Sequence, residues 1–180
     1  MEIVLIRHTS VDVPQGTCYG QTDVPVKATF KQEAAVTKAN LQSFEPFDKV
    51  FCSPLTRCVE LATFCGYADA QRDDRIKEIN FGEWEMKLFD AINDPRMQEW
   101  FDDYLHVAPT GGESFLELYQ RVAAFLDELR TKSYQRVAVF AHGGVLLCAQ
   151  IYAGVVKIEE AFSALTPYGG VISLELKSKQ

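Results

Sequence analysis

Glu2-Ile3-Val4-Leu5-Ile6-Arg7-His8 is the stretch of sequence that decides the fold. Its apolar run is short and rich in β-branched residues, which is typical of a strand buried on both faces. Arg7 and His8 therefore fall where a buried strand leaves its sheet. Because open α/β sheets bind ligands at the carboxyl ends of their strands, we expect this pair to lie at a binding site.

A second buried strand also ends in a histidine. Residues 136–141 are largely apolar, and His142 follows them at once. We expect this strand end to lie at the same sheet edge as Arg7 and His8. An arginine and two imidazoles suit a phosphoryl group, which one of the imidazoles could attack.

Strands and helices alternate along the rest of the chain. Strands are predicted at residues 2–6, 49–52, 136–141 and 171–176, with a further short strand near residues 74–76. Helices are predicted at residues 29–42, 53–66, 85–105 with a break at Pro95, 115–129 and 144–153. This order predicts a three-layer α/β/α sandwich with a largely parallel central sheet. No linker or repeat divides the chain, so residues 1–180 are expected to form a single domain.

Two helices carry the spacing of a capping box at their start. The pairs are Thr29 with Gln32 and Ser114 with Glu117. In such a box each of the two side chains accepts a hydrogen bond from the other residue's backbone N–H. We therefore expect helices to begin directly after Thr29 and Ser114.

Arg57 lies in the first turn of the helix that Ser53 is expected to cap and Pro54 to begin. A cation is disfavoured there, because the N-terminus of a helix is already partly positive. A surface arginine could swing away from the helix end. The functional alternative is that Arg57 and the free backbone N–H groups of this turn bind an anion.

Composition narrows the class of protein. The chain has 180 residues, 47% of them hydrophobic, and a formal net charge of -7, which argues against a nucleic-acid binder. Its five cysteines include no CxxC pair and are expected to be reduced, mostly buried thiols of a cytoplasmic protein. No stretch has the length of a membrane span, and the N-terminus does not have the pattern of a signal peptide.

Three glutamates cluster in the segment 75–85: Glu78, Glu83 and Glu85. A charged cluster in a loop is usually a solvated surface, so residue chemistry alone leaves open which of them takes part in a reaction. His106 lies among acidic residues near a predicted helix end and is expected at the surface.

Four segments resemble, in order, the motifs of the histidine phosphatase superfamily, also called phosphoglycerate mutase-like. They are Arg7-His8-Thr9, Ser53-Pro54-Leu55-Thr56-Arg57-Cys58, residues 78–85 and Ala141-His142-Gly143-Gly144-Val145. The resemblance implies that His8 is the nucleophile and becomes a phosphohistidine. It implies that Arg7, Arg57 and His142 hold the phosphoryl oxygens, His142 as part of the catalytic set. It also selects Glu78 as the acid that protonates the leaving oxygen.

Such a site needs neither a metal ion nor another cofactor. Two guanidiniums and an imidazole can oppose the charge that spreads over the phosphoryl oxygens. The chain also has no HExxH and no Walker motif, which argues against a zinc hydrolase or a P-loop protein.

The segment after the Arg-His pair departs from the common pattern of this family. Thr9 and Ser10 replace the usual glycine and the acidic or amide residue, and Pro14 stands where many members have a phosphate-binding asparagine. These departures leave the details of the phosphate pocket open.

Residues 16–25 and 109–114 resemble the α-ribazole phosphatase branch of the family. This resemblance implies that the substrate is α-ribazole 5'-phosphate or adenosylcobalamin 5'-phosphate. It also implies that Tyr19 and Gln21 bind this small phosphate ester, and Tyr19 could stack on the benzimidazole.

Other functions remain open at this point. A phosphoglycerate mutase or a broad-specificity sugar phosphatase would have the same fold, and a non-catalytic phosphate-binding module would share the scaffold. The segments 9–27 and 86–112 are expected to cover the phosphate pocket. Aromatic residues in them either stack on a base or belong to the core: Tyr19, Phe89, Trp100, Phe101 and Tyr104. The oligomeric state is not predicted.

Overall fold

The computed structural model describes residues 1–177, and within them a five-stranded sheet has the order β3-β2-β4-β1-β5. The strands are β1 (Glu2–Arg7), β2 (Lys49–Cys52), β3 (Gln71–Arg72), β4 (Arg136–Ala141) and β5 (Val171–Glu175). Strands β1 to β4 are parallel, and β5 pairs antiparallel with β1 at one edge. The expected largely parallel sheet is confirmed.

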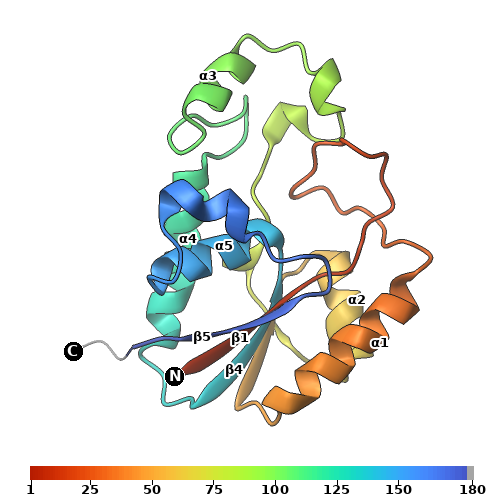
Figure 1. The fold of residues 1–180 in the computed structure, drawn as a ribbon, viewed down its shortest axis with the longest axis vertical. Helices are drawn as coiled ribbons and strands as arrows, with labels where there is room; N and C mark the ends of the chain where they lie inside the picture. Colours follow the sequence, from red (N-terminus) through yellow and green to blue (C-terminus); the bar gives the residue numbers. More distant parts are fainter. Residues whose placement is uncertain (178–180) are drawn as a thin grey trace.

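Helices cover both faces of this sheet, so the predicted three-layer sandwich is confirmed (Figure 1). One face carries α4 (Phe115–Leu129) and α5 (Gly143–Tyr152), and the other carries α1 (Phe30–Leu41) and α2 (Thr56–Phe64). Within these described residues no helix is long and apolar enough to span a bilayer.

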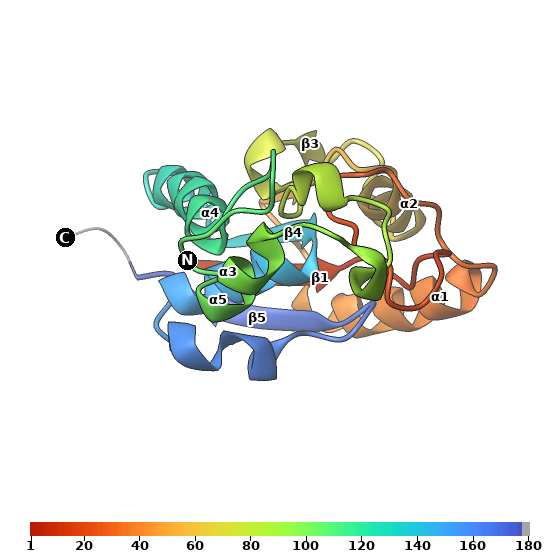
Figure 2. The ribbon, with the colours of Figure 1, turned by 90° about the horizontal axis from the view of Figure 1, so that it is seen from above.

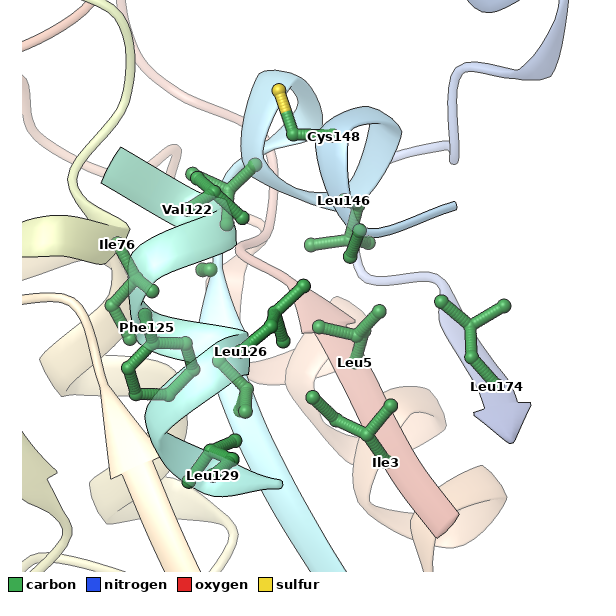
Figure 3. Close-up of a cluster of buried hydrophobic side chains, with 14 of the residues drawn as sticks. Ile3, Leu5, Ile76, Val122, Phe125, Leu126, Leu129, Leu146, Cys148 and Leu174 are labelled. Atoms are coloured by element: carbon green, nitrogen blue, oxygen red, sulfur yellow. The ribbon is translucent and has the colours of Figure 1, made fainter. Parts of the chain in front are cut away.

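The two faces of β1 belong to two separate hydrophobic clusters. Ile3 and Leu5 belong to the cluster under α4 and α5, and Figure 3 shows them beside Leu126 of α4. Val4 and Ile6 belong to the cluster under α1 and α2. A strand that buries both faces needs apolar residues at every position, which explains the continuous run in the sequence.

Some local predictions are confirmed by the hydrogen bonds. The Ser114 hydroxyl accepts from the Glu117 N–H at 3.2 Å, and the Glu117 carboxylate accepts from the Ser114 N–H at 2.7 Å. Gly66 follows α2 with φ of 97°, a left-handed conformation that suits glycine. The five cysteines are buried free thiols, as expected.

The predicted capping box at Thr29 and Gln32 is wrong. Helix α1 does begin at Phe30, but the Thr29 side chain accepts no capping hydrogen bond. Its hydroxyl instead donates to the Glu33 carboxylate at 2.7 Å. Glu33 also accepts from the backbone N–H of Ser10 at 3.0 Å, so this carboxylate ties α1 to the loop that follows β1.

The segment between α2 and α4 is less regular than predicted. The strand expected near residues 74–76 is wrong, because Asp73 accepts from the Arg75 N–H and starts the 3-10 turn η2 (Asp74–Ile76). The prediction of a helix from residue 85 up to Pro95 is also wrong, because the chain forms only 3-10 turns there. The other elements are η1 (Gln42–Phe44), η3 (Gly82–Trp84), η4 (Phe89–Ala91), α3 (Arg96–Asp102) and η5 (Ile158–Ala164).

This irregular segment lies over the carboxyl ends of the parallel strands. Figure 1 shows α3 and its flanking turns above the sheet, and Figure 2 shows α3 crossing over β1 and β4 when viewed from above. The fold therefore places a cover over the sheet edge at which the strand-end histidines emerge.

Candidate active site

His8 and His142 meet at this sheet edge because the strands that carry them, β1 and β4, are parallel neighbours. Their ring centroids are 5.2 Å apart, and His142 is fully buried while His8 is 2% exposed. Two imidazoles that are far apart in sequence thus face one another in a largely dry site.

A backbone carbonyl fixes the tautomer of His8. Its Nδ1 lies 2.7 Å from the carbonyl oxygen of Thr9, which can only accept, so Nδ1 carries the proton. The Nε2 atom therefore keeps its lone pair. Burial, and next the positive charge of Arg57, lower the pKa of His8 to about 3. The imidazole is neutral at physiological pH, which is the form that a nucleophile requires.

The guanidinium groups of Arg7 and Arg57 both lie near the two histidines. Arg7 donates through Nη1 to the Thr166 carbonyl at 2.6 Å, and Arg57 donates to the carbonyls of Thr22 and Gly20. The Nε atoms of both arginines are buried and have no hydrogen-bond partner within residues 1–177. Buried unpaired donors are costly, so two of them beside the histidines indicate a site built for an anion.

The hydroxyl of Ser53 bonds to the imidazole ring of His142. Its Nε2 and the Ser53 Oγ share a hydrogen bond of 2.7 Å, and the Ser53 side chain is fully buried. Burial, and next the charge of Arg57, hold the pKa of His142 well below its usual value. His142 is therefore neutral, with Nε2 bound to Ser53 and Nδ1 3.9 Å from the Cys58 sulfur.

The predicted helix start at Ser53 and Pro54 is wrong, although the Ser53 hydroxyl accepts from the Leu55 N–H at 3.3 Å as well as bonding to His142. Helix α2 begins at Thr56 instead. The Asp23 carboxylate accepts from the Thr56 N–H at 2.8 Å, so this backbone donor is not available to an anion. Arg57, in the same turn, lowers the pKa of both histidines through its positive charge.

Glu78 lies against the start of α5. Its carboxylate accepts from the Ile79 N–H at 2.9 Å and from the Gly144 N–H at 3.1 Å. A Cβ atom at position 144 would lie 2.3 Å from the Glu78 Oε1, so only glycine permits this approach. Glu78 lines the same cavity as His8 and Arg7.

The other two glutamates of the cluster have different surroundings. The Glu85 carboxylate accepts from the backbone N–H groups of Gly20, Gln21 and Thr22, so it anchors the loop 9–27. Glu83 is exposed and is not among the residues that line the cavity. Geometry thus separates Glu78 from its neighbours, a distinction that residue chemistry alone left open.

A cavity of about 370 Å³ extends from these polar groups into an aromatic chamber. Arg7, His8 and Glu78 lie at one end, which we call the phosphate end. The other end, the aromatic end, is built mainly from rings of the segment 81–115 and of η5. The aromatic residues that line the cavity are Tyr19, Phe81, Phe89, Trp100, Tyr104, Phe115 and Phe162.

Not every residue expected at this site lies in the cavity. Arg57 and His142 are fully buried behind it and, like Gln21 and Phe101, are not among its lining residues. Phe101 is 61% exposed. His106 is at the surface, as predicted. Sequence reasoning missed Tyr168, whose ring centroid is 5.6 Å from that of His8. No period or motif marks this tyrosine, because it lies in the loop before β5.

Comparisons with known proteins agree with this geometry. The sequence model of the histidine phosphatase superfamily (branch 1) matches residues 3–180. Adenosylcobalamin/alpha-ribazole phosphatase of Escherichia coli is 32% identical over 160 residues, which cover 81% of this chain and 75% of that protein. Phosphoserine phosphatase 1 of Hydrogenobacter thermophilus is 29% identical over 150 residues, 79% and 71% of the two chains.

Among solved structures, the alpha-ribazole phosphatase from Shigella flexneri has the same fold. It superposes with a TM-score of 0.86 at 25% identity, over 98% of this chain and 91% of that chain. The similarity therefore covers both the sheet that carries the histidines and the segments that cover it.

Proposed function

The chain belongs to branch 1 of the histidine phosphatase superfamily, and from this premise we propose that it hydrolyses a phosphate monoester through a phosphohistidine on His8. The observation that carries the proposal is the phosphate end of the cavity. There a neutral imidazole with a free Nε2 lies within the electrostatic reach of Arg57 and Arg7, whose buried Nε atoms have no partner within residues 1–177.

The first step transfers the phosphoryl group to the protein. The Nε2 of His8 attacks phosphorus, and the bond from phosphorus to the ester oxygen breaks. Arg7, Arg57 and His142 oppose the charge on the phosphoryl oxygens during the transfer. Glu78, in its carboxylic acid form, gives its proton to the departing alkoxide and is left as a carboxylate.

The second step releases phosphate. The Glu78 carboxylate takes a proton from a water molecule, which attacks phosphorus as the P–N bond of phosphohistidine breaks. The products are inorganic phosphate and neutral His8, so the site returns to its starting state. Glu78 thus gives one proton to the alkoxide in the first step and regains one from water in the second.

The aromatic end of the cavity supports a substrate whose organic half is flat and apolar. Trp100 and Phe89 lie with ring planes inclined by 23° and centroids 6.3 Å apart, and Tyr104 packs against Phe162. Such rings favour an aromatic base over the charged amino acid part of phosphoserine. We therefore propose α-ribazole 5'-phosphate as the preferred substrate. The cavity volume suits this nucleotide better than the far larger adenosylcobalamin 5'-phosphate.

A panel of phosphate esters tests this proposal by kcat/KM. α-Ribazole 5'-phosphate and ribose 5-phosphate share the sugar phosphate and differ in the base, so their ratio isolates the contribution of the aromatic end. We expect α-ribazole 5'-phosphate to exceed ribose 5-phosphate, phosphoserine and 3-phosphoglycerate. Equal values for the first two would overturn the substrate assignment. Isomerisation of 3-phosphoglycerate in place of hydrolysis would support the mutase alternative.

A further inference from the structure

Two tyrosines meet over the arginines of the phosphate end. The hydroxyl oxygens of Tyr19 and Tyr168 are 2.9 Å apart and share a hydrogen bond. The Arg7 guanidinium carbon lies 4.1 Å from the ring centroid of Tyr168, and that of Arg57 lies 5.4 Å from the ring centroid of Tyr19. The negative face of an aromatic ring attracts a guanidinium at such distances.

The turn that carries Tyr168 is bound to the catalytic strand. The Gly169 N–H donates to the His8 carbonyl at 2.9 Å, and the Thr166 carbonyl accepts from Arg7 at 2.6 Å. Tyr168 is therefore held against the end of β1 by bonds on both sides of it. A substitution at Tyr168 is therefore expected to displace the Arg7 side chain more than any other group of the phosphate end.

Tyr19 also separates the catalytic cavity from a second one. It lines both the cavity of about 370 Å³ and another of about 360 Å³, which Tyr168 also lines, together with residues of the loop 10–17 and Lys27. The hydrogen bond between the two phenols thus lies at the boundary between these spaces.

We propose that Tyr19 and Tyr168 act as one unit, the tyrosine pair, that closes the phosphate end and holds Arg7 and Arg57 in place during phosphoryl transfer. The inference rests on the proposed phosphatase function and adds two positioning residues to it. Burial and the bond to Tyr168 raise the pKa of Tyr19, so its phenol stays neutral beside the phosphate.

This assignment changes the expectation for Tyr19. The sequence suggested that Tyr19 stacks on the organic half of the substrate. Its ring instead lies beside the Arg57 guanidinium, and its hydroxyl is bound to Tyr168. Tyr19→Phe is therefore expected to impair α-ribazole 5'-phosphate and p-nitrophenyl phosphate by the same factor.

A double-mutant cycle tests the pair. Tyr19→Phe, Tyr168→Phe and the double variant are compared with wild type by kcat/KM on p-nitrophenyl phosphate and by affinity for vanadate, a mimic of transferring phosphate. Each single variant loses the shared hydrogen bond, so each should lose about fivefold in both measures. The double variant loses the same bond, so its loss should also be about fivefold. Tyr67→Phe, which removes a remote phenol bonded to Glu45, is the matched control.

The possible outcomes are separable. A double-variant loss of about 25-fold, the product of two independent effects, would overturn the pair as a unit. Unchanged kcat/KM and vanadate affinity in all three variants would also overturn it, provided that His8→Ala abolishes turnover. If the wild-type protein hydrolyses no phosphate ester, the proposed function fails, and vanadate affinity alone still decides whether the two tyrosines act together.

Discussion

The two ends of the cavity are built from different kinds of structure. At the phosphate end, His8 and His142 follow neighbouring parallel strands and Arg57 lies in the first turns of α2. At the aromatic end, the rings come mostly from 3-10 turns, loops and the short helix α3. Rigid elements can hold reacting groups to a fraction of an ångström, whereas irregular segments can vary in shape without disturbing them. We propose that the phosphate end carries out the chemistry and that the aromatic end selects the substrate.

Replacing the nucleophile should have the largest effect and should not depend on the organic half of the substrate. We expect His8→Ala to lower kcat at least about 10³-fold on every ester, because it removes the proposed nucleophile. The measurement is kcat of wild type and variant on α-ribazole 5'-phosphate and on ribose 5-phosphate, and the loss should be similar on both. A residual kcat above about a tenth of wild type would remove His8 from the nucleophile role.

Glu78→Gln should have the next largest effect, and it should depend on the leaving group. An alkoxide needs a proton in the transition state and p-nitrophenolate hardly does, so we expect a loss of about 10²-fold or more on ribose 5-phosphate and a much smaller one on p-nitrophenyl phosphate. Glu83→Gln, at an exposed neighbour, is the control. If Glu83→Gln shows the leaving-group dependence and Glu78→Gln does not, the acid is assigned to the wrong residue.

A substitution at the aromatic end should discriminate between substrates. Trp100→Leu removes a ring that lines the cavity, and we expect about a tenfold loss in kcat/KM on α-ribazole 5'-phosphate, the size of one stacking contact. On ribose 5-phosphate the loss should be no more than about twofold. Phe101→Leu, next in sequence and outside the cavity, is the control. Equal losses on both substrates would show that the two ends are not functionally separate.

A last prediction concerns stability, not activity, and belongs to the phosphate end. The pKa of His8 is about 3 in the folded protein against 6.5 ordinarily, so between these values the unfolded chain binds a proton that the folded chain does not. Stability therefore falls as pH falls below about 6.5, by up to about 1.4 kcal/mol per pH unit from this residue.

Denaturant titrations of wild type and His8→Asn from pH 7 to pH 4 measure this contribution. The variant should lose less stability over that range than wild type does, and the exposed His106→Asn should behave as wild type. Parallel curves for wild type and His8→Asn would mean that His8 is not held neutral by burial.

The sequence predicted the phosphate end better than the aromatic end, for a physical reason. An apolar run that ends in a charged or polar residue marks a strand end, and parallel strands bring their ends to one edge. Arg7, His8 and His142 could be placed together in this way. The position of Glu78 could not, because it depends on the absence of a side chain at Gly144, a close contact without a sequence period.

Two misplaced predictions concern hydroxyl side chains at helix starts. Ser53 has the pattern of a helix cap, but its hydroxyl is bound to His142, a residue distant in sequence. Thr29 likewise bonds to Glu33, whose carboxylate also holds Ser10. The Ser53 hydroxyl bonds to His142 in addition to accepting from the Leu55 N–H, and the Thr29 hydroxyl bonds to a side chain one turn along its own helix. Capping propensity considers only the backbone N–H groups of the first turn, so it could not identify these side-chain partners.

The central claim is that the phosphate end forms a covalent bond to phosphorus at His8. A rapid-quench experiment with a 32P-labelled substrate, stopped in alkali to preserve phosphohistidine and followed by peptide mapping, tests it most directly. We predict a label that appears within the first turnover, is lost in acid, and maps to the peptide carrying His8. A label on another residue, or hydrolysis at full rate with no labelled protein at any time, would contradict the account.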